Sequence, residues 1–227
     1  MVAFFKNKKN IFVSLLLIVA VIISIFVPIG VNASPAMAGR HDVPILTVET
    51  NVKCVAITMN LEAYINMAKL REVLGNEKIT FFASRYFEEN YFMDLIRLKK
   101  DGHSIGILDK DSKGKTKFEV YDLLADRIEN YSYLTGSGTE LVRFKGYDSI
   151  CVKSTLDVGL FPVQWSCDDT AEYFTNGNII LVYDIEGLIK MMKLLKNDGF
   201  TLVTVDELIY KENFSISLNG TQILNET

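Results

Sequence analysis

Histidine and cysteine are scarce in this sequence of 227 residues, which holds 2 histidines and 3 cysteines. His41 and His103 have no partner at the spacing of metal ligands, and the cysteines match no zinc-binding pattern. A glycine-rich phosphate loop, a GxSxG nucleophile elbow and a cysteine–histidine pair are also missing. These absences argue against the most common zinc, nucleotide and nucleophilic chemistries. The odd cysteine count leaves at least one thiol free or paired between chains, and we expect buried structural cysteines at Cys54, Cys151 and Cys167.

Acidic residues are absent before Asp42, whereas three lysines within residues 1–10 precede an uncharged apolar run at residues 11–27. This pattern is typical of an export signal or of a membrane anchor. We expect either a hydrophobic transmembrane helix over residues 11–31, with its N-terminus in the cytoplasm, or a signal peptide cleaved near Ala38. The remainder would then be a membrane-anchored extracytoplasmic domain or a secreted one.

The composition of the remaining chain predicts a folded and acidic domain. Hydrophobic residues make up 49% of the sequence, which is enough for one sizeable core. Beyond residues 1–10 there are 21 basic and 28 acidic residues, a net charge of about −7. Such a charge argues against nucleic acid or an anionic lipid surface as a partner.

From residue 52 onward, short apolar and β-branched runs alternate with helix-like stretches. Glycines such as Gly102 and Gly199 follow helical periods and precede strands, where a left-handed position favours glycine. Alternation of this kind predicts a parallel sheet covered by helices, most economically a barrel. We expect residues 1–32 to be a cytoplasmic stub with the anchor or signal peptide, 33–51 a linker, 52–210 the barrel domain, and 211–227 a tail. The tail adds an edge strand or is disordered. The expected strands are VKCVAIT, ITFFAS, SIGIL, LVRF, FPVQWS, NIILVY and TLVTV.

Polar residues follow several of these strands at their carboxyl ends, where barrels place their sites. Many of them are acidic and would offer oxygen ligands to a hard cation such as Ca²⁺ or Mg²⁺. Aspartates at strand ends are more commonly turn or capping residues, and Trp165 inside an apolar run is more commonly part of the core. The alternative to turn and capping roles is a ligand-binding rim, for which the candidate residues are Asp109, Asp111, Arg143, Tyr147, Asp168, Asp169, Tyr183 and Asp184.

The order of motifs over residues 52–210 resembles the polysaccharide deacetylase family, the NodB homology domain. The resemblance rests on seven segments and on their spacing. It implies a distorted (β/α)7 barrel, preceded here by the N-terminal hydrophobic helix. It also implies a divalent metal held by two histidines and a carboxylate, with a second carboxylate as base and a further histidine as acid. The matching segments are CVAITMN, ITFFAS, DGHSIGI, LVRFKGY, VQWSCDD, GNIILVYD and DGFTLVTVDEL.

The catalytic positions that the resemblance implies carry other residues in this sequence. Asn60 stands where the family has the base, and Tyr183 where it has the acid histidine. The three metal-ligand positions are also replaced. Two features are kept, namely the arginine that orients the base, Arg143, and the aspartate after the acid position, Asp184. His103 matches a scaffold histidine at the start of a strand. The replaced ligand positions are Leu61, Leu108 and Ser112.

These replacements leave three hypotheses for function. The first is a catalytically degenerate, exported deacetylase-like protein that binds or scaffolds cell-wall glycan, with no cofactor expected. The second is an active hydrolase of carbon–nitrogen bonds in N-acetylated glycans, using acids such as Asp109, Asp168 or Asp184 and a metal such as zinc. The third is a protein-binding component of an envelope or sporulation complex. The partners expected are a membrane through residues 11–31 and a glycan or an envelope protein, and no nucleic acid.

Overall fold

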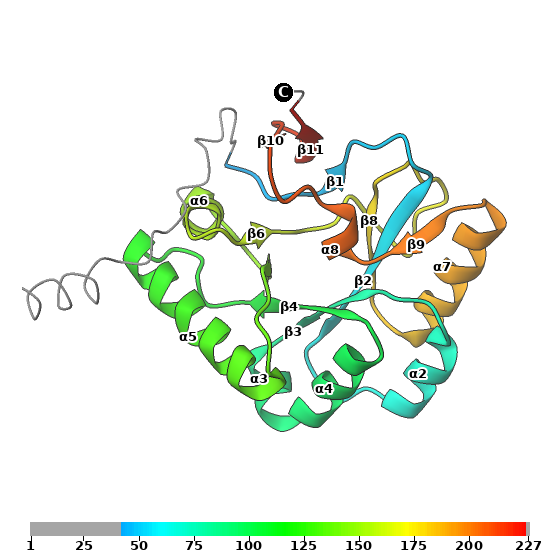
Figure 1. The fold of residues 1–227 in the computed structure, drawn as a ribbon, viewed down its shortest axis with the longest axis horizontal. Helices are drawn as coiled ribbons and strands as arrows, with labels where there is room; N and C mark the ends of the chain where they lie inside the picture. The colour runs from blue at the N-terminus through cyan, green and yellow to red at the C-terminus, as the bar shows by residue number, and fades with distance from the viewer. Residues whose placement is uncertain (1–41, 226–227) are drawn as a thin grey trace, which may run out of the picture. The chain divides into compact units, whose positions relative to one another are not determined.

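The computed structural model describes residues 42–225, and the anchor or signal predicted over residues 1–32 and the cleavage site near Ala38 lie outside them. The described chain forms a curved, parallel sheet in the order β6-β5-β4-β3-β2-β8-β7, and β9 also pairs in parallel with β2 (Figure 1). The predicted distorted barrel of parallel strands and helices is confirmed. Its strands are β2 (Cys54–Leu61), β3 (Thr80–Ala83), β4 (Ser104–Asp109), β5 (Leu141–Phe144), β6 (Phe161–Pro162), β7 (Cys167–Asp168), β8 (Ile179–Val182) and β9 (Thr201–Val203).

Helices connect the strands, and most begin at a side chain that caps them. Asn66, Ser84 and Asp184 each accept a hydrogen bond from a backbone N–H in the first turn of the helix that follows. Thr116 and Glu119 form a reciprocal capping box at the longest helix of the described chain. The short polar side chains between apolar runs therefore place the helix starts directly after the strands. The helices are α2 (Met67–Leu74), α3 (Arg85–Asn90), α4 (Phe92–Lys100), α5 (Lys117–Thr135), α6 (Ser149–Asp157), α7 (Ile185–Asn197) and α8 (Val205–Leu208).

The sheet does not close between its two edge strands, β6 and β7. We expected a single strand over FPVQWS, but residues 161–162 pair with β5 whereas residues 167–168 pair with β8. Residues 163–166 run from one edge to the other. Ile45 forms a parallel bridge with Val163 beside this crossing. The expected strand is interrupted because its two ends belong to opposite edges of an open barrel.

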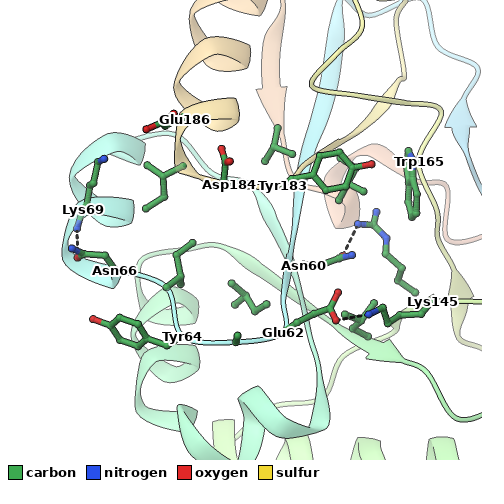
Figure 2. Close-up of a pocket in the computed structure, with 18 of the residues that line it drawn as sticks. Asn60, Glu62, Tyr64, Asn66, Lys69, Lys145, Trp165, Tyr183, Asp184 and Glu186 are labelled. Atoms are coloured by element: carbon green, nitrogen blue, oxygen red, sulfur yellow. Dashed lines mark hydrogen bonds and ion pairs between the residues drawn. The ribbon is translucent and has the colours of Figure 1, made fainter.

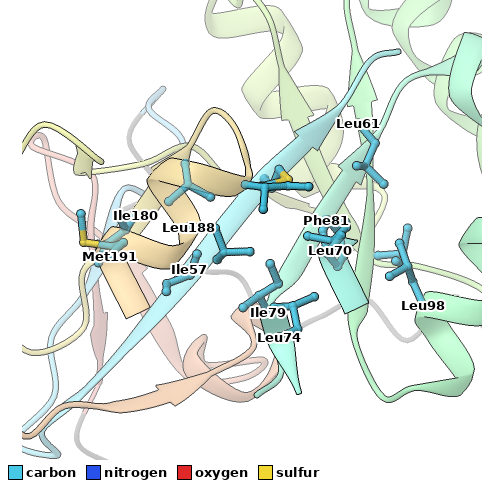
Figure 3. Packing of buried hydrophobic residues seen from close by; sticks show 14 of the residues in the cluster. Ile57, Leu61, Leu70, Leu74, Ile79, Phe81, Leu98, Ile180, Leu188 and Met191 are labelled. Atoms are coloured by element: carbon cyan, nitrogen blue, oxygen red, sulfur yellow. The ribbon is translucent and has the colours of Figure 1, made fainter. Parts of the chain in front are cut away.

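Buried apolar side chains alternate between two sides of the sheet along β2. Ile57 and Leu61 belong to a cluster that packs against α2, α4 and α7 (Figure 3). Cys54 and Ala56 belong to a second cluster on the other side, inside the barrel. Because side chains along a strand alternate in direction, Asn60 shares the inner side with Ala56. This alternation directs Asn60 toward the interior of the barrel.

Two segments outside residues 52–210 also pack into the core. β1 (Thr47–Val48) lies in the segment expected to be a linker, and β10 (Phe214–Ile216) and β11 (Thr221–Leu224) lie in the predicted tail. These strands form a three-stranded sheet in the order β1-β11-β10. Ile45, Phe214 and Ile216 are fully buried in the inner cluster. Their apolar side chains cover one end of the barrel, so the folded unit begins before residue 52 and extends past residue 210.

Among residues 42–225, no helix is both long and apolar enough to cross a membrane. All three cysteines carry free thiols, with Cys54 and Cys151 buried and Cys167 half-buried. Burial raises the pKa of Cys151 to about 11, which keeps its thiol protonated at neutral pH. Cys54 and Cys151 are therefore buried as expected, whereas Cys167 is only half-buried.

Candidate functional site

A pocket of about 750 Å³ opens at the carboxyl ends of β2, β5 and β8. The loop after β2 and the first turn of α7 form its walls (Figure 2). Parallel strands bring their carboxyl ends to one edge, which is why residues distant in sequence meet here. Six of the candidate site residues from the sequence line this pocket: Asn60, Leu61, Leu108, Arg143, Tyr183 and Asp184.

Arg143 is the most unusual residue of the pocket, because its side chain is fully buried. Its Nη1 donates a hydrogen bond to Asn60 Oδ1 at 3.1 Å, and the remaining guanidinium nitrogens donate to the backbone oxygens of Val163 and Gln164 at 3.4 and 3.3 Å. The guanidinium stacks over the ring of Phe82, 4.0 Å from its centroid. Burial lowers the pKa of Arg143 to about 9, so the group is still charged at neutral pH.

Asn60 occupies the position where the resemblance implies a base. A carboxamide is neutral and cannot take up a proton near pH 7. Its oxygen is already occupied by the hydrogen bond from Arg143. The arginine therefore contacts this position, and the residue that occupies it cannot act as a base.

Tyr183 occupies the position where the resemblance implies the acid histidine. Its hydroxyl donates a hydrogen bond to Asp168 Oδ2 at 3.3 Å, and the ring is 61% exposed at the rim of the pocket. Partial burial and the charge of Asp168 raise the pKa of Tyr183, which makes it a poorer proton donor than a histidine. Asp184, which follows it, accepts the N–H of Gly187 at 2.8 Å and caps α7.

The divalent metal that the resemblance implies does not fit the residues present. Leu61 and Leu108 line the pocket with hydrocarbon, are 1% and 2% exposed, and have no lone pair to offer a cation. Ser112 is buried within the loop after β4, does not line the pocket, and has an Oγ without a hydrogen-bond partner. Within residues 42–225, no group of three or more histidine, cysteine, aspartate or glutamate side chains is placed to hold a metal ion.

Four of the rim aspartates predicted from the sequence do not line the pocket. Asp109 is buried and accepts the N–H of Ser112 at 3.0 Å, and Asp111 lies exposed in the same loop. Asp168 and Asp169 lie near Tyr183, and their oxygens accept hydrogen bonds within that neighbourhood. The backbone N–H and hydroxyl of Thr170 donate to Asp168 and lower its pKa, and the N–H of Tyr183 donates to Asp169. Asp109 and Asp168 therefore stabilise their own turns, as aspartates after strands commonly do.

Tyr147 and Trp165 also differ from the sequence prediction. Tyr147 lines a smaller, neighbouring depression, not the pocket itself. Trp165, which we expected in the core, is half-buried, lines the pocket and lies with its ring centroid 5.3 Å from the Arg143 guanidinium. It becomes a pocket residue because the crossing at residues 163–166 turns its side chain toward the carboxyl ends of the strands.

The sequence prediction missed several polar pocket residues. Glu62 and Lys145 form an ion pair of 2.5 Å at the rim. Tyr64 is 67% exposed and contacts Tyr91, with ring centroids 5.8 Å apart. A usable signal was present, because these residues directly follow the ends of β2 and β5. The other polar residues of the pocket that the sequence prediction missed are Asn66, Lys69 and Glu186.

Fold and pocket together define a barrel of the polysaccharide deacetylase type whose catalytic positions carry residues of different chemistry. No family model matches the sequence, and no curated protein matches it. Solved structures do match, at identities that show a shared fold. This protein has the fold of the family 4 carbohydrate esterases.

Three of these structures illustrate the likeness. A family 4 carbohydrate esterase from Bacillus anthracis is 22% identical, with a TM-score of 0.65 over 74% of this chain and 88% of that chain. A family 4 pseudoenzyme, also from Bacillus anthracis, is 18% identical, with a TM-score of 0.66 over 82% and 74% of the two chains. A family 4 carbohydrate esterase from Bacillus subtilis is 21% identical, with a TM-score of 0.63 over 74% and 85%.

Proposed function

We propose that this protein is an exported, catalytically degenerate polysaccharide deacetylase-like protein that binds cell-wall glycan in its pocket without hydrolysing it. In this proposal residues 11–31 anchor the barrel at the outer face of a membrane. One observation carries the proposal: the pocket stays open at the usual place of the fold, although Asn60, Leu61, Leu108 and Tyr183 within it have replaced catalytic residues.

The lining of the pocket supports binding of a sugar. Trp165, Tyr64 and Tyr183 present aromatic surface around it, and two of these rings are more than half exposed. Aromatic faces pack against apolar faces of sugar rings, and the polar groups between them supply hydrogen bonds. A pseudoenzyme among the solved structures with this fold shows that the fold also occurs without activity.

Saccharide titration tests the binding part of the proposal. The full-length protein in detergent would be titrated calorimetrically with N-acetylated chito-oligosaccharides. Replacement of Tyr64 with alanine removes an exposed pocket ring, and we expect about fivefold weaker binding, or about 1 kcal/mol. Tyr133→Ala is the matched control, since Tyr133 is 87% exposed on α5 and does not line the pocket. Equal affinities for the two variants would contradict the proposed site.

Acetate release tests the catalytic part. We expect no turnover of the same oligosaccharides with added Zn²⁺ or Co²⁺, because leucine at two ligand positions and asparagine at the base position provide neither a metal site nor a base. Turnover that chelation abolishes, together with one retained metal ion per chain, would refute the degenerate assignment. In that case the hydrolase hypothesis would replace it.

A further inference from the structure

The two buried arginines of the described chain have very different partners. Arg127 is 3% exposed and forms a two-pronged ion pair with Glu88, with distances of 2.7 and 3.0 Å. Arg143 is fully buried and, among residues 42–225, forms no ion pair with a carboxylate. A buried charge without a counter-ion is costly, and its field is weakly screened because water is excluded around it. The pocket therefore contains an uncompensated positive charge.

The side chain of Asn60 connects the buried arginine to the pocket, because it accepts a hydrogen bond from Arg143 and lines the pocket. A guanidinium has only donors, so the atom of Asn60 that faces Arg143 is the carboxamide oxygen. The Nδ2 group is then the end of the carboxamide that does not contact the arginine, on a half-buried side chain that lines the pocket. A position that would carry an accepting carboxylate in an active member of the family presents hydrogen-bond donors here.

The acids around the pocket do not neutralise this corner. Glu62 is paired with Lys145, Asp184 caps α7, and Glu186 lies on the first turn of the same helix. All three are exposed to solvent, which screens their charges. In Figure 2, Asp184 and Glu186 lie toward α7, away from the dashed contact between Asn60 and the arginine. The buried charge of Arg143 therefore lies at one end of the pocket, whereas Lys69, which also lines the pocket, is exposed to solvent on α2.

We propose that the corner formed by Asn60 and Arg143 binds the carboxylate of an acidic saccharide. The inference rests on the proposed glycan binding and specifies its ligand class. The carboxylate oxygens accept hydrogen bonds from Asn60 Nδ2 and provide the counter-charge that Arg143 lacks. The sugar ring that carries the carboxylate packs against Trp165, which lines the same end of the pocket beside the guanidinium.

Calorimetric titration of the full-length protein tests the inference with three ligands: a uronic-acid oligosaccharide, a neutral chito-oligosaccharide of equal length, and sodium acetate. We expect the acidic saccharide to bind about tenfold more tightly than the neutral one, as a charge-assisted hydrogen bond implies. Asn60→Asp supplies an internal counter-ion and should abolish the preference. Asn76→Asp adds the same charge at an exposed turn outside the pocket and should keep it.

The outcomes separate this inference from the proposed function. Equal binding of both saccharides to the unmodified protein would overturn the carboxylate site and leave glycan binding intact, as would a preference that survives in Asn60→Asp. Binding of acetate without any saccharide would keep the carboxylate site and refute glycan binding. If none of the three ligands binds, both the carboxylate site and the proposed glycan binding are overturned. Asn60→Leu removes the amide donors without adding charge and should also lose the preference, which guards against a folding defect peculiar to one variant.

Discussion

Replacing Asn60 with aspartate should stabilise the fold, because it gives the buried Arg143 a carboxylate at the place where a carboxamide now accepts its hydrogen bond at 3.1 Å. Opposite charges about 4 Å apart attract with about 4 kcal/mol at an effective dielectric constant of about 20. Desolvation of the half-buried carboxylate offsets part of this gain. The present hydrogen bond already has a charged donor, so only the attraction of the added carboxylate is gained, and after desolvation about 1 to 2 kcal/mol of it remains. We expect the free energy of unfolding to rise by that amount, and the melting temperature by about 2 to 8 °C.

The gain should depend on pH in a defined direction. Arg143 lowers the pKa of the introduced aspartate in the folded state below the value of about 3.9 for unfolded aspartate. The added stability is therefore fully present above about pH 4 and is lost as pH falls through the folded pKa. Scanning calorimetry of the unmodified protein and of Asn60→Asp at about pH 7 and about pH 3 measures the difference, with Asn76→Asp as the control. A melting temperature at neutral pH that is unchanged or lower would refute the assignment of an uncompensated charge to Arg143.

Three further predictions concern the scaffold. Glu88→Ala leaves Arg127 buried without its ion pair and should lower the free energy of unfolding by about 3 to 5 kcal/mol, measured by urea denaturation; a loss below about 1 kcal/mol would contradict the buried pair. Burial lowers the pKa of His103 to about 4, so between about pH 6.5 and 4 the unfolded chain binds more protons than the folded chain does. The free energy of unfolding should therefore fall by up to about 3 kcal/mol as pH drops through that range, and this pH dependence should disappear in His103→Gln. Gly106→Ala places a Cβ 2.6 Å from the ring of Phe82 and 2.9 Å from the Cβ of Leu141, and it should cost about 1 to 3 kcal/mol in the same denaturation assay; an unchanged free energy of unfolding would contradict this close packing.

The alternation of apolar runs and helical periods predicted the barrel because each strand needs a crossover and two covered faces. Individual strands were predicted well where both faces are buried, as in β2 and β4. The run FPVQWS was misjudged because its composition is that of one strand, whereas hydrogen bonding divides it between opposite edges of the sheet. Ile45 was assigned to a linker because a single buried side chain carries no periodic signal.

Several residues of the pocket could be named from their positions after strands. Asn60, Arg143 and Tyr183 were found in this way, and all three line it. Asp109 and Asp168 follow strands as well, but each carboxylate accepts hydrogen bonds from its own turn. Sequence position places a residue at the edge of the barrel and leaves the direction of its side chain undecided.

The sequence by itself determined the alternation of strands and helices, the kind of barrel and the residue types at the positions that the resemblance marks as catalytic, because these depend on local periodicity and on the chemistry of single side chains. Only the tertiary structure decided that the pocket stays open, that Trp165 lines it, and that Arg143 is buried without a carboxylate. Those properties depend on which side chains meet across strands far apart in sequence. The uncompensated charge of Arg143 is such a property, since it depends on every neighbour that the fold brings near the guanidinium.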